Sequence, residues 1–429
     1  MKTISGSICA PRGFKCAAVF CDIKKLGTGK GSEKGRKDDL ALIVSDVPAA
    51  VAGMFTTNQV CAAPVKVSRK IAAKKFARAM VVNSGNANAA TGKQGLVDAE
   101  RMTVVAARTL SLNKTDVLVC STGRIGVAMP MRNVERGIRA CAPLITRSTS
   151  NARKVAEAIM TTDTRRKEIA VEFKIDNVMV RIGAICKGAG MIQPGMATML
   201  AFITSDVAIE SSALKRALKT AVEQSFNRIT VDGDMSTNDS VIILANGLAR
   251  NKPLSLPSKL DRLNRSSLFE AKREFEEALS FVCLELAKMI VRDGEGVSRF
   301  VTVRVRGARH ARDAEMAARS IANSTLVRTS WCGGDPNWGR VLCALGYSKA
   351  KVNEAIVDVG YSRAGKREIA WGFRRGQAGE SLRKLSKIAA AKEFEVHVDL
   401  HLGHGEFVLY ATDLTEDYVS FNKGDVTGG

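Results

Sequence analysis

The chain has 429 residues, of which 45% are hydrophobic and 25% charged. These are ordinary globular values, so the composition excludes a disordered, collagen-like or coiled-coil protein as the overall description. Only 5% of the residues are aromatic, which predicts a core built from aliphatic side chains. The 65 Lys and Arg residues against 43 Asp and Glu residues give a formal net charge of +22, which favours anionic partners.

The ten cysteines are scattered and form no CxxC pair. In a chain of this length the pattern predicts reduced, mostly buried thiols in a cytoplasmic protein. The first sixteen residues lack the apolar stretch of a secretory signal. The longest uncharged runs, residues 47–65 and 188–205, contain proline and polar residues, which disfavours a membrane-spanning helix in either run.

The first third of the chain alternates short apolar runs with polar segments. Residues 42–44, 80–82 and 117–119 are bounded by turn residues and predict buried strands. The charged, glycine-rich residues 24–39 predict an exposed loop, and the Asn/Gly-rich residues 83–88 predict a loop directly after a strand. A helix is expected over residues 98–110.

The second half begins with a helix that Ser211 or Ser212 caps. A longer amphipathic helix is predicted over residues 268–291, and Gly294 ends it. Residues 300–305 alternate as a strand, and residues 396–402 and 407–411 flank a turn at 403–405, which predicts a β-hairpin. Strands and helices therefore mix throughout, as in layered α/β or α+β proteins.

Several chemical motifs are absent or incomplete. Residues 27–31 and 85–93 have the composition of phosphate loops but the wrong glycine spacing, so both are interpreted as plain loops. His397, His401 and His404 follow an alternating strand pattern and are predicted to face solvent, with no metal site. The basic residues are dispersed and few Tyr or Trp residues accompany them, so nucleic-acid binding is not the expected function.

The most unusual segment is the Gly/Pro-rich run at residues 187–200, KGAGMIQPGMATML. Composition alone favours a tight buried loop between strands. The alternative is that Thr198, after the small Ala197, attacks its own preceding carbonyl, and that hydrolysis then leaves Thr198 as a new N-terminus. Its hydroxyl would be the nucleophile, and its α-amine, with a reference pKa of about 7.7–8.0, the general base.

This segment resembles the cleavage and nucleophile segment of the ornithine acetyltransferase family, the bifunctional arginine-biosynthesis acetyltransferases. Further matching segments follow in order along nearly the whole chain. They include residues 36–42 (RKDDLAL), 55–58 (FTTN), 83–88 (NSGNAN), 121–123 (STG), 160–164 (MTTDT), 225–234 (SFNRITVDGD), 293–296 (DGEG), 334–340 (GDPNWGR) and 413–419 (DLTEDYV).

The resemblance implies a role for each matching position. The catalytic residues would be the nucleophile Thr198 and the oxyanion-hole pair Thr122 and Gly123, with cleavage between Ala197 and Thr198. The substrate-binding residues would be Thr161 (with Thr162 as the neighbouring alternative), Lys187, Thr198, Glu295, Asn422 and Thr427. A glycine amide and a threonine suit an oxyanion hole because neither adds bulk. Glu295 suits the ammonium group of ornithine.

The sequence departs from the family pattern at two places. Arg299 stands four residues after Glu295, where the family often has lysine, so the charge is kept but the donor geometry changes. The C-terminal segment 422–427 (NKGDVT) carries less charge and aromatic character than usual, although the spacing from Asn422 to Thr427 is preserved.

The resemblance implies a layered α/β fold, an α+β sandwich of the autoprocessed N-terminal-Thr type. Residues 1–197 would form an α chain and residues 198–429 a β chain, associated as α₂β₂ in the cytoplasm. The implied reaction is ping-pong transfer of acetyl from N²-acetylornithine to glutamate, with acetyl-CoA as a further donor in bifunctional members. No metal or other cofactor and no nucleic-acid or membrane partner is implied. The alternatives are a related N-terminal-nucleophile amidohydrolase or aminopeptidase, and an uncleaved binding protein.

Overall fold

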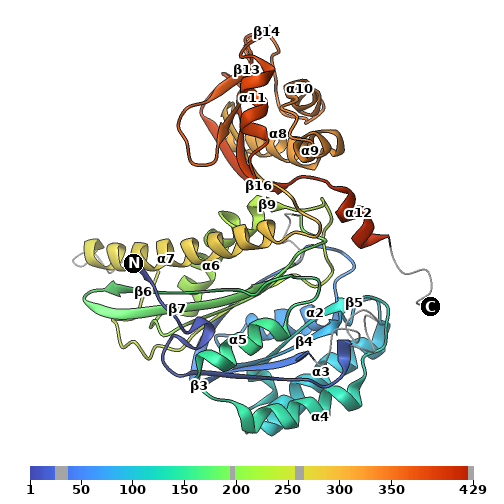
Figure 1. Cartoon of the computed structure of the whole chain (residues 1–429). Coiled ribbons are helices and arrows are strands. Elements are labelled where there is room, and N and C mark those ends of the chain that lie inside the picture. The colour runs from blue at the N-terminus through green and yellow to red at the C-terminus, as the bar shows by residue number, and fades with distance from the viewer. Residues whose placement is uncertain (25–36, 194–198, 257–264, 424–429) are drawn as a thin grey trace. The chain divides into compact units, whose positions relative to one another are not determined.

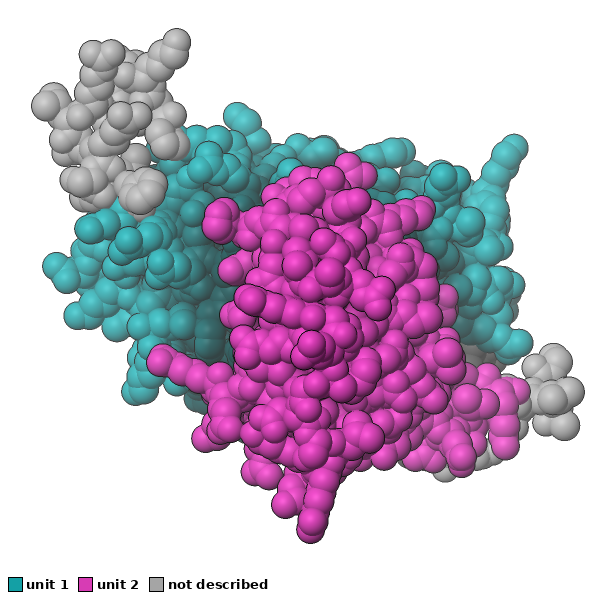
Figure 2. All heavy atoms as spheres, turned by 90° about the horizontal axis from the view of Figure 1, so that it is seen from above, with its two compact units in different colours: residues 1–188, 195–227, 235–290 teal, residues 189–194, 228–234, 291–429 magenta. Residues whose placement is uncertain are grey.

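The computed structural model describes residues 1–24, 37–193, 199–256 and 265–423. The chain divides into two compact units, which Figure 2 shows in teal and magenta. Unit 1 comprises Met1–Gly188, Gly195–Asn227 and Met235–Ile290, and unit 2 comprises Ala189–Pro194, Arg228–Asp234 and Val291–Gly429. Each unit combines a sheet with helices, which confirms the predicted layered α/β class.

Unit 1 is built on a sheet in which nine strands of the described residues take part, in the order β1-β6-β7-β8-β10-β3-β4-β5, with β2 also paired to β3. The strands are β1 (Lys2–Thr3), β2 (Phe14–Val19), β3 (Leu40–Phe55), β4 (Phe76–Asn86), β5 (Val117–Arg124), β6 (Lys167–Ile175), β7 (Val178–Lys187), β8 (Leu200–Ser205) and β10 (Ser240–Ala245). The pairs β4–β5 and β8–β10 are parallel.

The long strand β3 joins two parts of this sheet. Its first residues pair with β2 and β4, its last residues pair with β10, and its register is irregular between Val44 and Ala49. One hydrophobic cluster includes Ile185, Phe202 and Ile242 from β7, β8 and β10 together with side chains of β3, β4 and β5. The two parts of the sheet therefore pack against each other, as predicted for a sandwich.

Helices cover the strands of unit 1 on both sides. In Figure 1, α6 and α7 lie on one side of β6 and β7, and α3, α4 and α5 lie on the other. The helices are α2 (Ala63–Ala72), α3 (Gly92–Thr109), α4 (Met131–Cys141), α5 (Thr149–Ala158), α6 (Ser211–Glu223) and α7 (Arg265–Arg292), with 3₁₀ turns η1 (Ser7–Cys9), η3 (Lys114–Asp116), η4 (Ala142–Leu144) and η5 (Phe226–Arg228).

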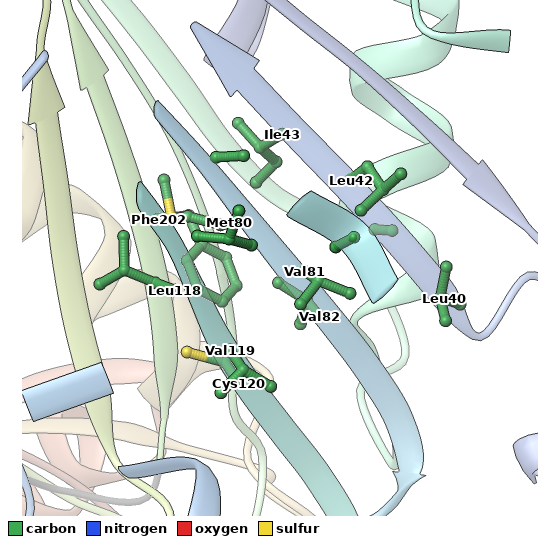
Figure 3. Close-up of a cluster of buried hydrophobic side chains, with 14 of the residues drawn as sticks. Leu40, Leu42, Ile43, Met80, Val81, Val82, Leu118, Val119, Cys120 and Phe202 are labelled. Carbon is green, nitrogen blue, oxygen red and sulfur yellow. The ribbon is translucent and has the colours of Figure 1, made fainter. Parts of the chain in front are cut away.

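The core of unit 1 is aliphatic, as the low aromatic content predicts. Figure 3 shows part of it, where Leu42, Val81 and Val119 of three neighbouring strands lie in one cluster with Phe202. Burial of such side chains is the main favourable term in folding, at about 25 cal/mol per Å² of apolar surface removed from water. Strands that are buried on both faces need continuous apolar runs, which is why these segments could be recognised in the sequence.

Unit 2 contains a second sheet with the order β14-β13-β12-β15-β11-β16-β9. Its strands are β9 (Ile229–Thr230), β11 (Phe300–Ala308), β12 (Asp358–Arg363), β13 (Ala370–Arg374), β14 (Gln377–Ala378), β15 (Glu393–Asp399) and β16 (Gly405–Thr412). Its helices are α8 (Ala311–Asn323), α9 (Thr325–Cys332), α10 (Trp338–Gly346), α11 (Leu382–Ala389) and α12 (Glu416–Asn422). Side chains of α8 to α11 share one core with the sheet.

The predicted hairpin near the C-terminus is wrong. Both strands exist as β15 and β16, but β11 lies between them, parallel to β15 and antiparallel to β16. The connection passes around the end of β11, where the amides of Leu400 and Leu402 donate to the carbonyls of Arg306 and Gly307. Alternation of side chains identifies a strand but not its neighbour, so a strand from elsewhere in the chain could enter the pair.

Most other predicted elements are confirmed, with shifted ends. The strand expected at residues 80–82 continues as β4 to Asn86, so the segment 83–86 is strand and not loop. Helix α3 begins at Gly92, six residues before the predicted start. The helices expected at Ser211 and over 268–291 correspond to α6 and α7. The predicted serine cap of α6 is wrong, because Glu210 occupies the cap position without a side-chain hydrogen bond and Ser211 is the first helical residue. Residues 25–36, most of the predicted loop 24–39 and all of 27–31, lie outside the described residues.

The histidine prediction needs correction. His397 lies on β15, but its side chain is only 14% exposed and its ring contacts the Ser362 hydroxyl at 2.8 Å. Burial lowers the pKa of His397 to about 4. His401 and His404 lie in the β15–β16 connection and not in a strand. Strand β12 pairs with β15 and brings Ser362 to His397, and the local sequence pattern does not predict this pairing.

Seven of the ten cysteines are buried and all ten are free thiols. This agrees with the prediction of reduced, mostly buried side chains. In the part of the chain that the structure describes, no helix has both the length and the apolar character of a membrane span.

Candidate active site

Thr122 and Gly123, the predicted oxyanion-hole pair, lie near the end of β5 in unit 1. Gly123 has a φ of 133°, and a Cβ atom added there would lie 2.2 Å from the carbonyl carbon of Gly85 on β4. Any side chain at position 123 would therefore strain the backbone and collide with the neighbouring strand.

Lys187 is the last residue of β7, and its side chain reaches Thr122. The lysine is only 4% exposed, and its Nζ donates to the Thr122 hydroxyl at 3.3 Å. Lysine normally extends its charged end into water. The packing of β7 and β8 against β4 and β5 instead keeps this ammonium group inside unit 1, beside the predicted oxyanion hole.

Asp163 connects Thr161 to the same region of unit 1. Its carboxylate accepts hydrogen bonds from the Thr161 amide at 3.1 Å and from the Gly188 amide at 2.7 Å. Thr161 is half-buried, whereas its neighbour Thr162 is exposed. Asp163 therefore holds the Thr161 backbone, and the choice between Thr161 and Thr162 as a substrate contact stays a prediction.

A second buried carboxyl group belongs to Asp239, which directly precedes β10 and contacts the residue before β8. Oδ1 of Asp239 accepts the Met199 amide at 2.8 Å, and its Oδ2 is buried without a hydrogen-bond partner among the described residues. Burial raises the pKa of Asp239 well above its usual value, although the Met199 amide and the charge of Lys187 oppose the rise. Asp239 is therefore harder to ionise than an ordinary aspartate, and it contacts the residue that follows Thr198 in the sequence.

Asn238, the neighbour of Asp239, ties this part of unit 1 together. Its side-chain amide donates to the carbonyls of Ala87 at 2.6 Å and Ser121 at 2.9 Å. One amide group thus connects the segment before β10 with the ends of β4 and β5. This fixes the backbone directly before Thr122.

Unit 2 carries the predicted residues Glu295 and Asn422. The Asn422 side-chain amide donates to Glu295 Oε2 at 2.9 Å, so these two residues are in contact. The Glu295 amide donates to the Ala189 carbonyl at 2.9 Å. A Cβ atom added at Gly190 would lie within 2.4–2.6 Å of the Glu295 carboxylate, so a larger residue there would displace the end of the Glu295 side chain.

Further polar groups surround Glu295 in unit 2. Asp232 accepts the amides of Met191 and Ile192, and the Tyr418 hydroxyl lies 3.4 Å from its Oδ2. Burial, with the charges of Asp232 and Glu295, raises the pKa of Tyr418 to about 12. Tyr418 therefore remains a neutral hydroxyl at physiological pH, next to two carboxylates.

Arg299 has a structural role that accounts for the departure from lysine. Its Nε donates to the Ala389 carbonyl at 3.2 Å, and its Nη1 donates to the carbonyl of Cys332 and to the Ser298 hydroxyl. A guanidinium group serves such diverging acceptors better than a single ammonium group. The Arg299 side chain thereby connects the start of β11 with the ends of α9 and α11 within unit 2.

Three predicted positions, Ala197, Thr198 and Thr427, lie outside the described residues. Leu200, two residues after Thr198 in the sequence, pairs with Lys187 across β7 and β8. The cleavage-site and nucleophile predictions, and the looser C-terminal segment beyond Lys423, therefore stay predictions.

Sequence reasoning missed Asp163, Lys167, Asn238 and Asp239. Asp163 was part of a matching segment, yet nothing in that segment distinguishes it from an exposed loop residue. Its partner Gly188 is 25 residues away, and the partner of Asp239, Met199, is 40 residues away. Such contacts depend on strand pairing and leave no periodic signal in the sequence.

Comparison with known proteins identifies the family. The ArgJ family model matches residues 17–425. The chain is 44% identical over 427 residues to the arginine biosynthesis bifunctional protein ArgJ of Symbiobacterium thermophilum, spanning 98% of this chain and 99% of that protein. It is also 44% identical over 430 residues to the glutamate N-acetyltransferase of Methanocaldococcus jannaschii, with 98% and 99% coverage.

A solved structure of ArgJ from Bacillus halodurans is 38% identical and covers 52% of this chain and 98% of that chain, with a TM-score of 0.46. The family model and the two full-length relatives carry the assignment, because each spans nearly all of this chain. The chain is therefore an enzyme that belongs to the ArgJ family.

Proposed function

We propose that the chain cleaves itself between Ala197 and Thr198 and then transfers an acetyl group from N²-acetylornithine to glutamate in arginine biosynthesis. Residues 1–197 and 198–429 would be the α and β chains of the mature enzyme. The observation that carries the proposal is the buried contact between Lys187 and Thr122, beside the glycine-only position 123, in a member of this family.

In the first half-reaction the Thr198 hydroxyl attacks the acetyl carbonyl of N²-acetylornithine. The α-amine of Thr198 accepts the hydroxyl proton and passes it to the departing amine, so ornithine leaves and an acetyl ester remains on Thr198. Thr122 and the Gly123 amide would stabilise the negative charge that develops on the carbonyl oxygen. The nearby Lys187 ammonium adds a positive charge to that region of unit 1.

In the second half-reaction the amine of glutamate attacks the acetyl ester. The bond from the acetyl carbon to Thr198 breaks, N-acetylglutamate leaves, and the Thr198 hydroxyl regains a proton. Lys187 and Thr161 are proposed substrate contacts in unit 1, and Glu295 and Asn422 are proposed substrate contacts in unit 2. A carboxylate such as Glu295 is suited to a substrate ammonium group and a lysine to a substrate carboxylate.

Further properties come from the family resemblance alone. We infer that acetyl-CoA serves as a second donor, that the processed chains assemble as α₂β₂, and that the enzyme works in the cytoplasm without a metal or other cofactor. The relatives named as bifunctional proteins support the inference of a second activity.

The test supplies purified protein with N²-acetylornithine and glutamate and follows free ornithine and N-acetylglutamate. Equal release of both products, fragments of 197 and 232 residues on a denaturing gel, and an acetylated Thr198 fragment without glutamate are expected. Thr198→Ala should remain one inactive chain. Ornithine released together with acetate, whether or not glutamate is present, would instead identify an amidohydrolase. An uncleaved, inactive wild-type chain would identify a binding protein.

A further inference from the structure

We propose that Asp163 is a positioning residue of this enzyme, whose buried carboxylate holds Lys187, Gly188 and Thr161 in the arrangement that acetyl transfer needs. The proposal rests on the proposed function, because it assigns Asp163 to residues with proposed substrate roles. Asp163 touches none of the reacting atoms under this proposal and acts through its neighbours.

The geometry places one carboxylate between two segments with proposed substrate roles. Oδ1 of Asp163 accepts the Gly188 amide at 2.7 Å and the Lys167 ammonium at 2.6 Å, and Oδ2 accepts the Thr161 amide at 3.1 Å. The side chain of Asp163 is fully buried. Because Gly188 directly follows Lys187, this carboxylate ties the backbone just after β7 to the Thr161 segment that precedes β6.

Charge gives Asp163 a second effect on Lys187. Burial by itself would raise the pKa of Asp163, but the charges of Lys187 and Lys167 outweigh this effect and hold the pKa below its usual value. Asp163 is therefore ionised at neutral pH, and its negative charge stabilises the buried ammonium of Lys187 in return. Lys24 and Cys186 are the other titratable groups that interact with it.

A simpler account gives Asp163 only the task of neutralising Lys167. That lysine is 1% exposed and forms a direct ion pair with Asp163. Removing one partner of a buried ion pair strongly destabilises a protein, because the other charge remains buried without compensation. Replacing both partners by neutral residues of similar volume is often tolerated. On the simpler account the double replacement restores both stability and activity. On the positioning account it restores stability without activity.

The experiment compares the variant Asp163→Asn with the double variant Asp163→Asn/Lys167→Met. Thermal unfolding reports stability, a denaturing gel reports the cleaved fraction, and ornithine release from N²-acetylornithine per cleaved enzyme reports kcat/KM. Asp163→Asn should lose both stability and activity. The double variant should regain much of the lost unfolding temperature, although Lys187 stays buried without the Asp163 charge, while its kcat/KM stays about 10–100-fold low, the scale expected for a misplaced site.

The matched control is Arg304→Met/Glu395→Gln, which removes an ion pair between the partly exposed Arg304 of β11 and the buried Glu395 of β15 in unit 2. It should leave kcat/KM unchanged. Wild-type kcat/KM in the stable double variant at Asp163 would overturn the proposal and leave that residue a partner of Lys167 alone. If the wild-type enzyme passes acetyl to water instead of glutamate, the proposed function fails, and ornithine release in the same variants still tests Asp163.

Discussion

Lys187 and Thr122 belong to strands that are far apart in the order of the unit 1 sheet. They meet because the two parts of the sheet pack together, and the contact between Nζ and the hydroxyl oxygen is 3.3 Å. A buried lysine without compensation is unfavourable. Thr122 and the nearby charge of Asp163 therefore explain how this ammonium group is kept inside the protein.

Removal of the Thr122 hydroxyl should slow both half-reactions. Thr122→Ala is expected to reduce the rates of ornithine release and of acetyl transfer to glutamate by about 10²–10³-fold, because an oxyanion donor is lost. Single-turnover measurements of each step would check this. The control is Ser121→Ala, since the neighbouring hydroxyl is buried and has no hydrogen-bond partner among the described residues. Equal effects of the two variants would contradict a specific role of Thr122.

Asp239 should make the fold less stable as pH rises. Its raised pKa means that the folded chain holds a proton that the unfolded chain has already lost, so stability falls above the ordinary carboxyl pKa of about 3.9. Asp239→Asn mimics the protonated form and should raise the unfolding temperature at neutral pH, with a smaller gain in acid. The exposed turn residue Asp176 provides the control Asp176→Asn. A gain independent of pH would argue against this explanation.

At the scale of secondary structure, the proposed α and β chains are interleaved in one sheet. Strands β8 and β10 follow Thr198, whereas β7 and β3 precede it, and the sheet order is β7-β8-β10-β3. Strand β8 makes six residue pairs with β7, and β10 makes six with β3. The peptide bond before Thr198 is therefore not needed to hold the two segments together.

Cleavage should accordingly leave a single folded particle. The fragments of 197 and 232 residues are expected to elute together in native size-exclusion chromatography and to separate only in denaturant. The hydrogen bonds and buried side chains of the shared sheet should hold the two fragments together until denaturant disrupts them. An uncleaved Thr198→Ala chain serves as the size reference. Separation of the fragments in native buffer would show that these strand pairs do not hold the cleaved chains together.

At the scale of the whole molecule, each unit carries its own group of the predicted residues. Unit 1 contains Lys187, Thr122 and Gly123, and unit 2 contains Glu295 and Asn422. In unit 1 the Asp163 carboxylate accepts the amide of Gly188, next to Lys187. In unit 2 the side-chain amide of Asn422 donates to the Glu295 carboxylate.

Loss of the Glu295 charge should weaken the capture of ornithine-containing substrates. Glu295→Gln keeps the shape of the side chain but removes the attraction for an ammonium group, so kcat/KM for N²-acetylornithine should fall about tenfold, which corresponds to about 1.4 kcal/mol. Steady-state kinetics would measure this. The control Glu380→Gln alters an exposed carboxylate of unit 2 that pairs with Lys384. An unchanged kcat/KM in Glu295→Gln would exclude the residue from substrate binding.

The sequence by itself determined the aliphatic core, most strands and helices, and the family, because these depend on local apolar patterns and on motifs that keep their order along the chain. It also placed Lys187, Thr122 and Gly123 among the site residues through that resemblance. The sequence did not reveal that β11 separates β15 from β16, since alternation within a strand does not specify a neighbour.

Only the tertiary structure decided which buried polar groups meet. Asp163 contacts Gly188, and Asp239 contacts Met199, through strand pairings that join distant parts of the chain. The surroundings then shift the pKa values of two aspartates in opposite directions, because lysine charges lower the pKa of Asp163 and desolvation raises the pKa of Asp239. These pKa differences depend on the surroundings of each side chain after folding, so they cannot be predicted from residue type alone.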